Sequence, residues 1–310
     1  MHHPTDQAQN EPAPASPNPP SQIGRLVLVA STTLLVLAAV GVVGCSTNMI
    51  ESVLFYYPSP RAVQAPDGAE DVTFPSSVGR HARGKTLHAW WLAPTTDRPK
   101  GTVLFCHGNA DAIDAHHAFV SSLPSQGYGV LLFDYRGYGR SEWDGRLNRD
   151  RLIADAVGAL DYLRARNDVD PGRLFLIGHS MGSMVASNLA ADTAPGTFRA
   201  LTIVSPFSSF PRVAGDYVPV LGPILIPGGR APEDAVTKLG DLPLLIVFGN
   251  DDAIVRPYHA PIIHEAATNA GVATELREVP GANHITVLTS PSMQAEIAAF
   301  FDAHLPADTE

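Results

Sequence analysis

The sequence predicts an α/β fold, a mostly parallel eight-stranded sheet with helices on both faces. From residue 46 onward, short apolar runs alternate with segments of helical periodicity, a pattern typical of parallel sheets covered by helices. Of the 310 residues, 45% are hydrophobic and only 17% are charged, so the chain can bury a large core. No segment recurs at a fixed period, which argues against a solenoid or a propeller.

Eight strands and five helices are expected along the chain. The strands are predicted at residues 71–74, 86–92, 102–106, 130–133, 174–177, 201–204, 244–248 and 274–279. The helices are predicted at residues 111–125, 152–163, 181–191, 257–270 and 291–304. Between the sixth and seventh strands lies a cap segment at about 206–243, which is too short for a separate lid domain.

The first 45 residues differ from the rest of the chain. Residues 1–25 form a polar leader rich in Pro, Ala, Asn and Gln, which we expect to be disordered. The segment 26–45 begins with apolar residues that carry no charge and that, at about 1.5 Å per residue in a helix, are long enough to span a bilayer. A core helix that is apolar all round would need protein on every side, which disfavours that third interpretation.

Two membrane interpretations remain open for the segment 26–45. It is either a retained transmembrane anchor or a lipoprotein signal that ends at Cys45, where small residues before the cysteine permit cleavage and the thiol carries the lipid. Both place Arg25 in the cytoplasm and residues 46–310, a single domain, on the extracytoplasmic (periplasmic) side of the membrane.

Charge and cysteine content argue against several classes of protein. The formal net charge is −10, from 21 Lys and Arg against 31 Asp and Glu, so nucleic acid is not an expected partner. The cysteines, Cys45 and Cys106, are too few for a disulfide framework or a multi-cysteine zinc site. His116 and His117 are neighbours on a predicted helix and point about 100° apart, so we expect no metal there.

A candidate nucleophile follows the fifth predicted strand. The sequence Gly178-His179-Ser180-Met181-Gly182 lies between that strand and a helix rich in small residues. A serine on a sharp strand-to-helix turn needs small neighbours two positions to either side, and the two glycines meet that need. Ser180 is therefore the predicted nucleophile, and the Met181 N–H at the start of the helix is a predicted oxyanion donor. His179 is interpreted as structural, with its side chain pointing away from the tip of the turn.

This turn and several other motifs resemble those of the α/β-hydrolase superfamily. Residues 107–110 (HGNA) resemble the family's oxyanion loop, and residues 134–141 (DYRGYGRS) resemble the turn after its fourth strand. Residues 205–209 (SPFSS) and 54–58 (LFYYP) resemble segments of the membrane-anchored, bud-emergence-type serine hydrolases. The resemblance covers about residues 50–305 and implies an α/β-hydrolase fold and a serine hydrolase without a cofactor.

His284 is the predicted general base, since a serine nucleophile needs a histidine within hydrogen-bond reach. It follows the last predicted strand, in a loop at the carboxyl edge of the sheet, and it matches the family's position for the base. The other histidines lie in the leader, in early strands or in helices; His259 and His264, for example, fit a helical surface.

Two neighbouring aspartates compete for the role of the acid that fixes the tautomer of His284. Asp251 and Asp252 both follow the seventh predicted strand and so reach the same edge of the sheet. The family's G-x-x-D-x-x-V pattern, matched by Gly249 and Val255, selects Asp252. The order serine, aspartate, histidine along the chain is the order of this fold.

The loop after the third predicted strand is expected to complete the site. Gly108 allows the backbone to approach the substrate, so that the Asn109 N–H can point at the oxyanion. His107 resembles the family's loop-bracing histidine and is a supporting residue, not a second base. Cys106 lies in an apolar run and is interpreted as a small core residue.

These residues predict acyl transfer through an acyl-enzyme formed on Ser180. Esters, thioesters and small amides fit this chemistry, and carboxylic esters of moderate size are preferred because a short cap leaves the site fairly open. The alternatives are a serine peptidase or an acyltransferase on the same triad, and a non-catalytic membrane-tethered binding module. Apolar cap residues either shape an acyl pocket, face the membrane or pack on the sheet: Phe207, Phe210, Tyr217, Val218, Leu221, Ile224, Leu225 and Ile226.

Overall fold

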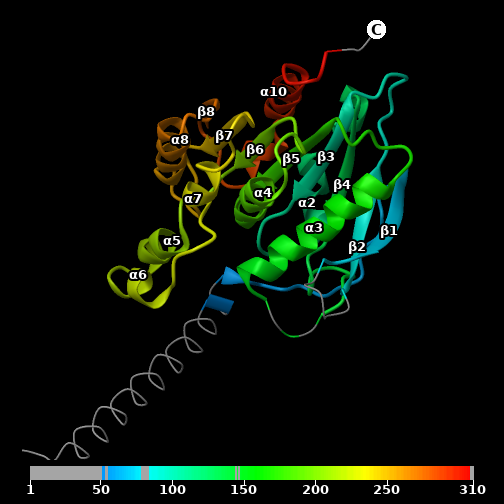
Figure 1. Ribbon diagram of the computed structural model, residues 1–310. Coiled ribbons are helices and arrows are strands. Elements are labelled where there is room, and N and C mark those ends of the chain that lie inside the picture. The colour runs from blue at the N-terminus through cyan, green and yellow to red at the C-terminus, as the bar shows by residue number, and fades with distance from the viewer. Residues whose placement is uncertain (1–50, 53–54, 78–83, 144, 146, 308–310) are drawn as a thin grey trace, which may run out of the picture. The chain divides into compact units, whose positions relative to one another are not determined.

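An eight-stranded sheet forms the centre of the described chain and confirms the predicted α/β architecture (Figure 1). The computed structural model describes residues 51–52, 55–77, 84–143, 145 and 147–307, which belong to one compact unit, Thr47–Glu310. The strand order across the sheet is β1-β2-β4-β3-β5-β6-β7-β8. β2 pairs antiparallel with β1 and β4, and all other pairs are parallel.

Each strand lies within two residues of its predicted ends. The bounds are β1 (Ala69–Pro75), β2 (Thr86–Leu92), β3 (Gly101–Cys106), β4 (Tyr128–Phe133), β5 (Leu174–His179), β6 (Leu201–Val204), β7 (Leu244–Gly249) and β8 (Thr274–Val279). The central strands β3 to β7 are almost entirely buried, because helices cover both faces of a parallel sheet.

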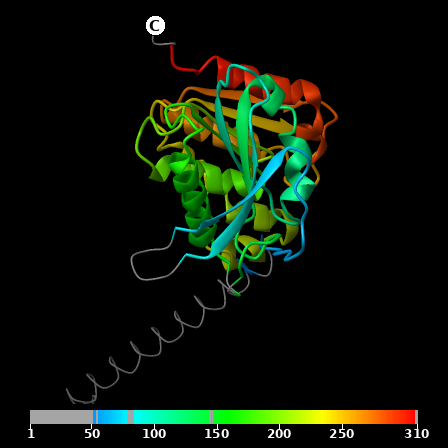
Figure 2. The same cartoon turned by 90° about the vertical axis from the view of Figure 1, so that its right-hand side faces the viewer.

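Helices pack on both faces of the sheet (Figure 2). One face is covered by α3 (Arg149–Ala165), α4 (Met181–Asp192), α7 (Pro232–Val236) and α8 (His259–Asn269). The other face carries α2 (Ile113–His116), the 3-10 helices η1 (His117–Phe119) and η2 (Pro124–Gln126), α9 (Thr286–Thr289) and α10 (Pro291–Asp302). Helices α5 (Phe210–Tyr217) and α6 (Leu221–Leu225) lie in the cap.

The single helix predicted at residues 111–125 is wrong, because the chain there forms three short pieces. Val120 has φ −133° and ψ 2°, which ends η1 after one turn. Pro124, which has no N–H to donate, then begins η2. Asp111, at the predicted start, has a φ of 61° and so lies outside a right-handed helix.

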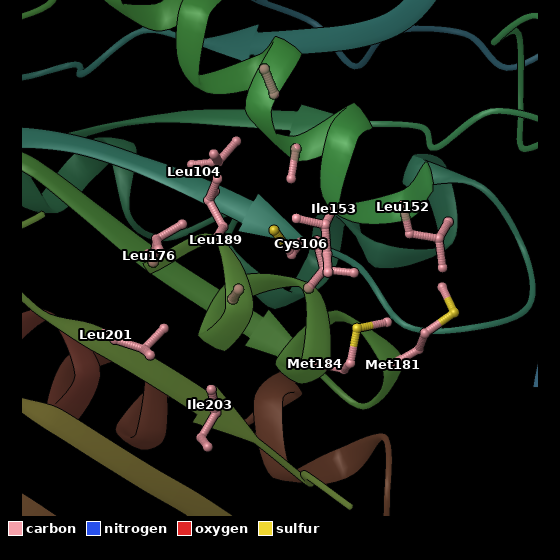
Figure 3. Packing of buried hydrophobic residues seen from close by; sticks show 14 of the residues in the cluster. Leu104, Cys106, Leu152, Ile153, Leu176, Met181, Met184, Leu189, Leu201 and Ile203 are labelled. Carbon is pink, nitrogen blue, oxygen red and sulfur yellow. The ribbon is translucent and has the colours of Figure 1, made fainter. Parts of the chain in front are cut away.

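The two sheet faces bury separate apolar clusters. In β3, Leu104 and Cys106 point into the cluster under α3 and α4, whereas Val103 and Phe105 point into the cluster under α10. Figure 3 shows the first cluster, with Leu104 and Cys106 beside Ile153 of α3 and the methionines of α4. Burial raises the pKa of the Cys106 thiol to about 12, so the thiol is protonated at neutral pH and does not act as a nucleophile.

The apolar residues of the cap divide into two groups. Phe207, Phe210 and Ile226 are buried and pack against the body of the domain. The remaining predicted residues are exposed, and they are Tyr217, Val218, Leu221, Ile224 and Leu225. Packing on the sheet therefore accounts for only part of the cap's apolar surface.

The N-terminal predictions lie outside the described residues. They concern the leader at 1–25, the apolar segment that ends at Cys45, and the choice between an anchor and a lipoprotein signal. Within the part of the chain that the structure covers, every helix is too short or too polar to cross a bilayer.

Candidate active site

Ser180 lies at the turn between β5 and α4, where the nucleophile was predicted. Its backbone has φ 54° and ψ −118°, a strained conformation for a residue with a side chain. Its N–H donates to the carbonyl of Val204 over 2.9 Å, which ties the turn to the end of β6. A Cβ on Gly182 would lie 1.9 Å from the carbonyl oxygen of Cys106, and a Cβ on Gly178 would lie 2.4 Å from the carbonyl oxygen of Gly182. The turn thus has the geometry of a nucleophile elbow, in which only glycine fits at both flanking positions.

His284 and Asp252 form a buried hydrogen-bonded pair. The His284 Nδ1 donates to the Asp252 Oδ2 over 2.7 Å, and the other carboxylate oxygen accepts the N–H groups of Ile254 and Val255, each over 2.9 Å. Burial opposes ionisation of Asp252, but His284 and these two N–H groups outweigh burial and hold the pKa of the carboxyl below its usual value. The ionised carboxylate fixes the tautomer of His284 that leaves its Nε2 free to accept a proton. Asp251, by contrast, is exposed.

Ser180 and His284 line the same cavity, whose volume is about 750 Å³. Among the described residues, the Ser180 hydroxyl makes no hydrogen bond to the His284 ring. Such contacts are often long in a ligand-free site and shorten when substrate binds. The structure therefore joins the predicted base and the predicted acid directly and places Ser180 in the cavity that His284 lines.

His179 contacts the loop that carries the base, a contact that the sequence did not indicate. Its side chain is buried, and its Nε2 donates to the backbone carbonyl of His284 over 3.0 Å. Burial, together with the nearby His284 and His116, lowers the pKa of His179 well below its usual value, so the ring is neutral. His179 also lines the cavity. The buried and bonded ring agrees with the structural interpretation of His179 and faces the loop that carries His284.

The predicted oxyanion residues Asn109 and Met181 both line the cavity beside Ser180. The Asn109 side chain holds its own loop in place, since its Oδ1 accepts the Tyr57 N–H over 2.9 Å and the Tyr138 hydroxyl over 2.8 Å. Met181 is the first residue of α4, so its N–H has no acceptor within the helix and is available at the site. Gly108 permits the close approach of this loop, because a Cβ there would lie 3.1 Å from the His179 Nδ1.

His107 supports the loop that follows β3. Its ring is fully buried, its Nδ1 donates to the carbonyl of Gly108 over 2.7 Å, and its ring centre lies 4.4 Å from that of Tyr135. Burial and the neighbouring His116 lower its pKa well below the usual value, so His107 is neutral and carries no charge into the site.

His259 is not on a helical surface as predicted. It is completely buried, and its Nε2 donates to Asp216 of α5 over 3.0 Å, while its Nδ1 accepts the Ser208 hydroxyl at 2.9 Å. It thereby ties the segment after β6 and the cap helix to α8. Among the residues that the structure describes, no group of three or more His, Cys, Asp or Glu side chains is arranged to hold a metal ion.

Comparisons with known proteins identify the family of this fold. A family model described as serine aminopeptidase, S33, matches residues 97–227. The uncharacterised protein YfhR of Salmonella typhi is 33% identical over 215 residues, 65% of this chain and 70% of YfhR. Lysophosphatidylserine lipase ABHD12 of Xenopus tropicalis is 31% identical over 207 residues, 60% of this chain and 51% of the lipase. The structure of the Pyrococcus furiosus esterase Pf2001 has a TM-score of 0.63 at 18% identity, over 81% of this chain and 100% of the esterase.

The mostly parallel sheet covered by helices is the fold that the structural comparison matches. The likeness to the archaeal esterase supports the fold alone, whereas the bacterial relative is similar enough in sequence to share a family. The chain therefore belongs to the α/β-hydrolase superfamily.

Proposed function

We propose that the protein is a membrane-anchored serine hydrolase that cleaves carboxylic esters through Ser180, His284 and Asp252. The observation that carries this proposal is the 2.7 Å hydrogen bond from His284 to the buried Asp252, in a cavity that also holds Ser180 on a strained turn. An ionised carboxylate held against a histidine beside a strained serine is the arrangement that acyl transfer requires.

The reaction follows from this arrangement. The Ser180 oxygen attacks the ester carbonyl as the His284 Nε2 takes its proton, and Asp252 stabilises the imidazolium that forms. The N–H groups of Asn109 and Met181 stabilise the oxyanion. His284 then protonates the leaving alcohol, and the acyl group stays on Ser180. In the second half, His284 takes a proton from water, the hydroxide releases the carboxylic acid, and Ser180 regains its proton.

The cavity wall favours an ester with an apolar acyl group. Most of the lining side chains are apolar and come from the segment before β1, from the cap and from the loop after β7. Among the described residues that line the cavity, Asp111 is the one acidic residue. Its carboxylate lies 3.7 Å from the Arg61 guanidinium. The Arg61 guanidinium partly offsets the negative charge of Asp111, which weakens the attraction of Asp111 for the positive amino group of an aminopeptidase substrate. Two similar proteins bear the names lipase and esterase, which agrees with ester cleavage.

Turnover of a series of nitrophenyl esters of increasing acyl length by the full chain in detergent tests this proposal. We expect turnover that falls by at least about 10³-fold in Ser180→Ala, because the nucleophile is lost. Ser187→Ala is the matched control, since Ser187 is buried on the same helix and its hydroxyl bonds only within α4. Faster acyl transfer to added alcohols than to water would indicate an acyltransferase, preference for amides would indicate a peptidase, and no turnover by a folded protein would indicate a binding module.

The same proposal includes attachment to the membrane through the apolar residues before Cys45, with the catalytic domain on the extracytoplasmic side. The intact mass of the mature protein distinguishes the two modes of attachment. A chain that begins at Cys45 and carries acyl groups supports a lipoprotein, and a chain that retains residues 26–44 supports a transmembrane anchor. Membrane attachment would be refuted if the protein were recovered outside the membrane fraction, with neither acyl groups on Cys45 nor residues 26–44.

A further inference from the structure

Exposed apolar side chains of the cap gather at the mouth of the cavity. The cap patch is defined here as Tyr217, Val218, Val220, Leu221, Ile224 and Leu225, all large, apolar and exposed. Val220 and Ile224 are the most exposed of them, at 75% and 72%. The stretch from Tyr217 to Leu225 reads YVPVLGPIL and contains no charged residue. A contiguous apolar surface of this kind is uncommon on a protein that meets only water.

The cap patch continues into the cavity that holds Ser180. Tyr217, Val218 and Leu225 line the cavity as well as the outer surface, while Val220, Leu221 and Ile224 are exposed and lie outside the cavity lining. An apolar path therefore leads from the outside of the cap to the nucleophile. A molecule with a long acyl chain could follow this path without exposing that chain to water.

Backbone strain at Val220 accompanies this exposure. Val220 has φ 70° and ψ −55°, and the Leu221 N–H donates to the carbonyl of Pro219 over 2.8 Å, which is the geometry of a strained γ-turn. A β-branched residue is unfavourable at such a φ. Backbone strain of this kind clusters at ligand-contacting and other functional segments.

The N-terminal chain enters the described structure against the base of the cap. The Phe55 ring lies 5.2 Å from that of Phe210, at the start of α5. Glu51 pairs with Arg149 over 2.7 Å, and the same guanidinium donates to the carbonyls of residues 227 and 228, which follow α6. Figure 1 shows α5 and α6 on the side of the domain where the described chain begins.

The length of the chain before Glu51 limits how far the cap can lie from a membrane. Seven residue steps separate Gly44, the last residue of the apolar segment, from Glu51, and at most about 3.6 Å per step gives a reach of about 25 Å. A protein attached through residues 26–44 or through Cys45 therefore keeps the base of the cap close to the lipid surface.

We propose that the cap patch docks into the acyl region of the bilayer and opens the cavity directly to lipid. Tethering and docking are then separate contacts, one through the N-terminal segment and one through the cap. Because the patch carries no charge, docking rests on burial of apolar area and is independent of anionic lipid and of salt. The substrate arm of the proposal rests on the proposed ester hydrolysis: the natural ester is one that resides in the membrane.

Fluorescence quenching tests docking without any need for catalysis. The full chain carrying Ile224→Trp is reconstituted in vesicles of phosphatidylcholine with brominated acyl chains, and its emission is compared with that of the wild-type chain. We expect the indole introduced by I224W to lose fluorescence in brominated but not in ordinary phosphatidylcholine. Ala299→Trp is the matched control and should keep its fluorescence, because Ala299 is exposed on α10, a helix that Figure 1 shows at the opposite end of the domain from α5 and α6. No quenching of I224W in the anchored protein would overturn the proposal. Protection of I224W from the brominated lipid that grows with protein concentration would also overturn it, because it would indicate a second copy of the chain on the patch.

An activity measurement tests the substrate arm. Leu221→Asp with Ile224→Asp should lower hydrolysis of a long-chain nitrophenyl ester held in phosphatidylcholine vesicles by more than about tenfold, since each inserted side chain contributes that much to partitioning. Hydrolysis of a short, soluble ester should be unchanged, because these two residues do not line the cavity. Ala295→Asp with Ala299→Asp adds the same charge on α10 and should affect neither substrate. If the double variant loses activity equally on both substrates, or loses none on the vesicle ester, the proposal that the natural ester resides in the membrane is contradicted. If the wild-type protein hydrolyses no ester but I224W is still quenched, ester hydrolysis is refuted and docking is not.

Discussion

At the scale of single residues, the contrast between Asp251 and Asp252 is the sharpest feature of the site. The two carboxylates are adjacent in sequence, yet Asp252 is buried and bonded to His284 while Asp251 is exposed. A buried carboxylate that accepts three hydrogen bonds is held in one geometry, and an exposed one is not. Substitution of Asp251 is therefore a matched control for substitution of Asp252.

Asp252→Asn should lower kcat for a nitrophenyl ester by about 10²- to 10⁴-fold, because the amide cannot hold the required tautomer of His284 or stabilise the imidazolium. Asp251→Asn should change kcat by less than about twofold, as expected for an exposed carboxylate that water screens. Steady-state kinetics of both variants, with circular dichroism as a check on folding, decides between them. Equal effects of the two substitutions would mean that Asp252 is not the acid.

Sequence reasoning named the candidate residues of the site but not the contacts that hold them. Asp252 was separable from Asp251 only through a family pattern, since both follow β7. The bond between His179 and the carbonyl of His284 joins residues 105 positions apart. No local pattern encodes such a contact, because it depends on how β5 and the loop after β8 meet. The burial of His259 against Asp216 was missed for the same reason.

At the scale of elements, the junction of β5 and α4 shows how backbone crowding sets the site. The start of α4 packs directly on the end of β3, where Gly182 meets the carbonyl oxygens of Cys106 and His107. Because there is no space for one additional carbon, this contact fixes the distance between the Ser180 turn and the loop that follows β3. The single helix predicted at 111–125 was wrong at this level as well, because Pro124 and the turn at Val120 interrupt the segment despite its apolar periodicity.

Gly182→Ala should destabilise the protein by about 2 kcal/mol or more, since its Cβ would overlap backbone atoms that cannot move aside like a flexible side chain. Gly228→Ala is the control, because no atom lies within 4 Å of a Cβ built there and its φ is not positive. Urea unfolding of both variants gives the comparison. A G182A protein as stable as G228A would show that the elbow is less crowded than described.

At the scale of the whole molecule, the carboxyl edge of the sheet collects a chain of buried histidines. Ring centres of His107 and His116 lie 4.9 Å apart, those of His116 and His179 lie 6.3 Å apart, and those of His179 and His284 lie 5.0 Å apart. Burial lowers the pKa of His107, His116 and His179, so folding keeps them neutral. The unfolded chain, in contrast, binds protons at these positions below about pH 6.5.

The contribution of these histidines to the free energy of unfolding should therefore be fully present above about pH 6.5. It should be lost as the pH falls from there toward the lowered pKa values of the folded protein. Each of the three histidines contributes up to about 1.4 kcal/mol per pH unit to this slope. Urea unfolding at several pH values measures the slope, and His116→Phe should make it shallower by the share of one histidine. The slope is the readout, because it is insensitive to packing changes that shift stability equally at every pH. An unaltered slope in H116F would contradict this account.

The overall architecture was the most predictable level. Strands β3 to β7 are short continuous apolar runs because both of their faces are buried, and this made them visible in the sequence. The order of strands across the sheet and the division of the cap into buried and exposed apolar residues were not visible. Both depend on which elements meet in three dimensions, and Phe210 and Ile224 differ in burial but not in character.

The most direct test of the central claim is covalent labelling of the full-length protein with a fluorophosphonate, followed by peptide mass spectrometry. The phosphonyl group should be found on Ser180, because its hydroxyl shares a cavity with the His284–Asp252 pair that would activate it. Labelling should disappear in Ser180→Ala and remain in Ser187→Ala. An adduct on another residue, or no adduct on a folded wild-type protein, would contradict the assignment of Ser180 as the nucleophile.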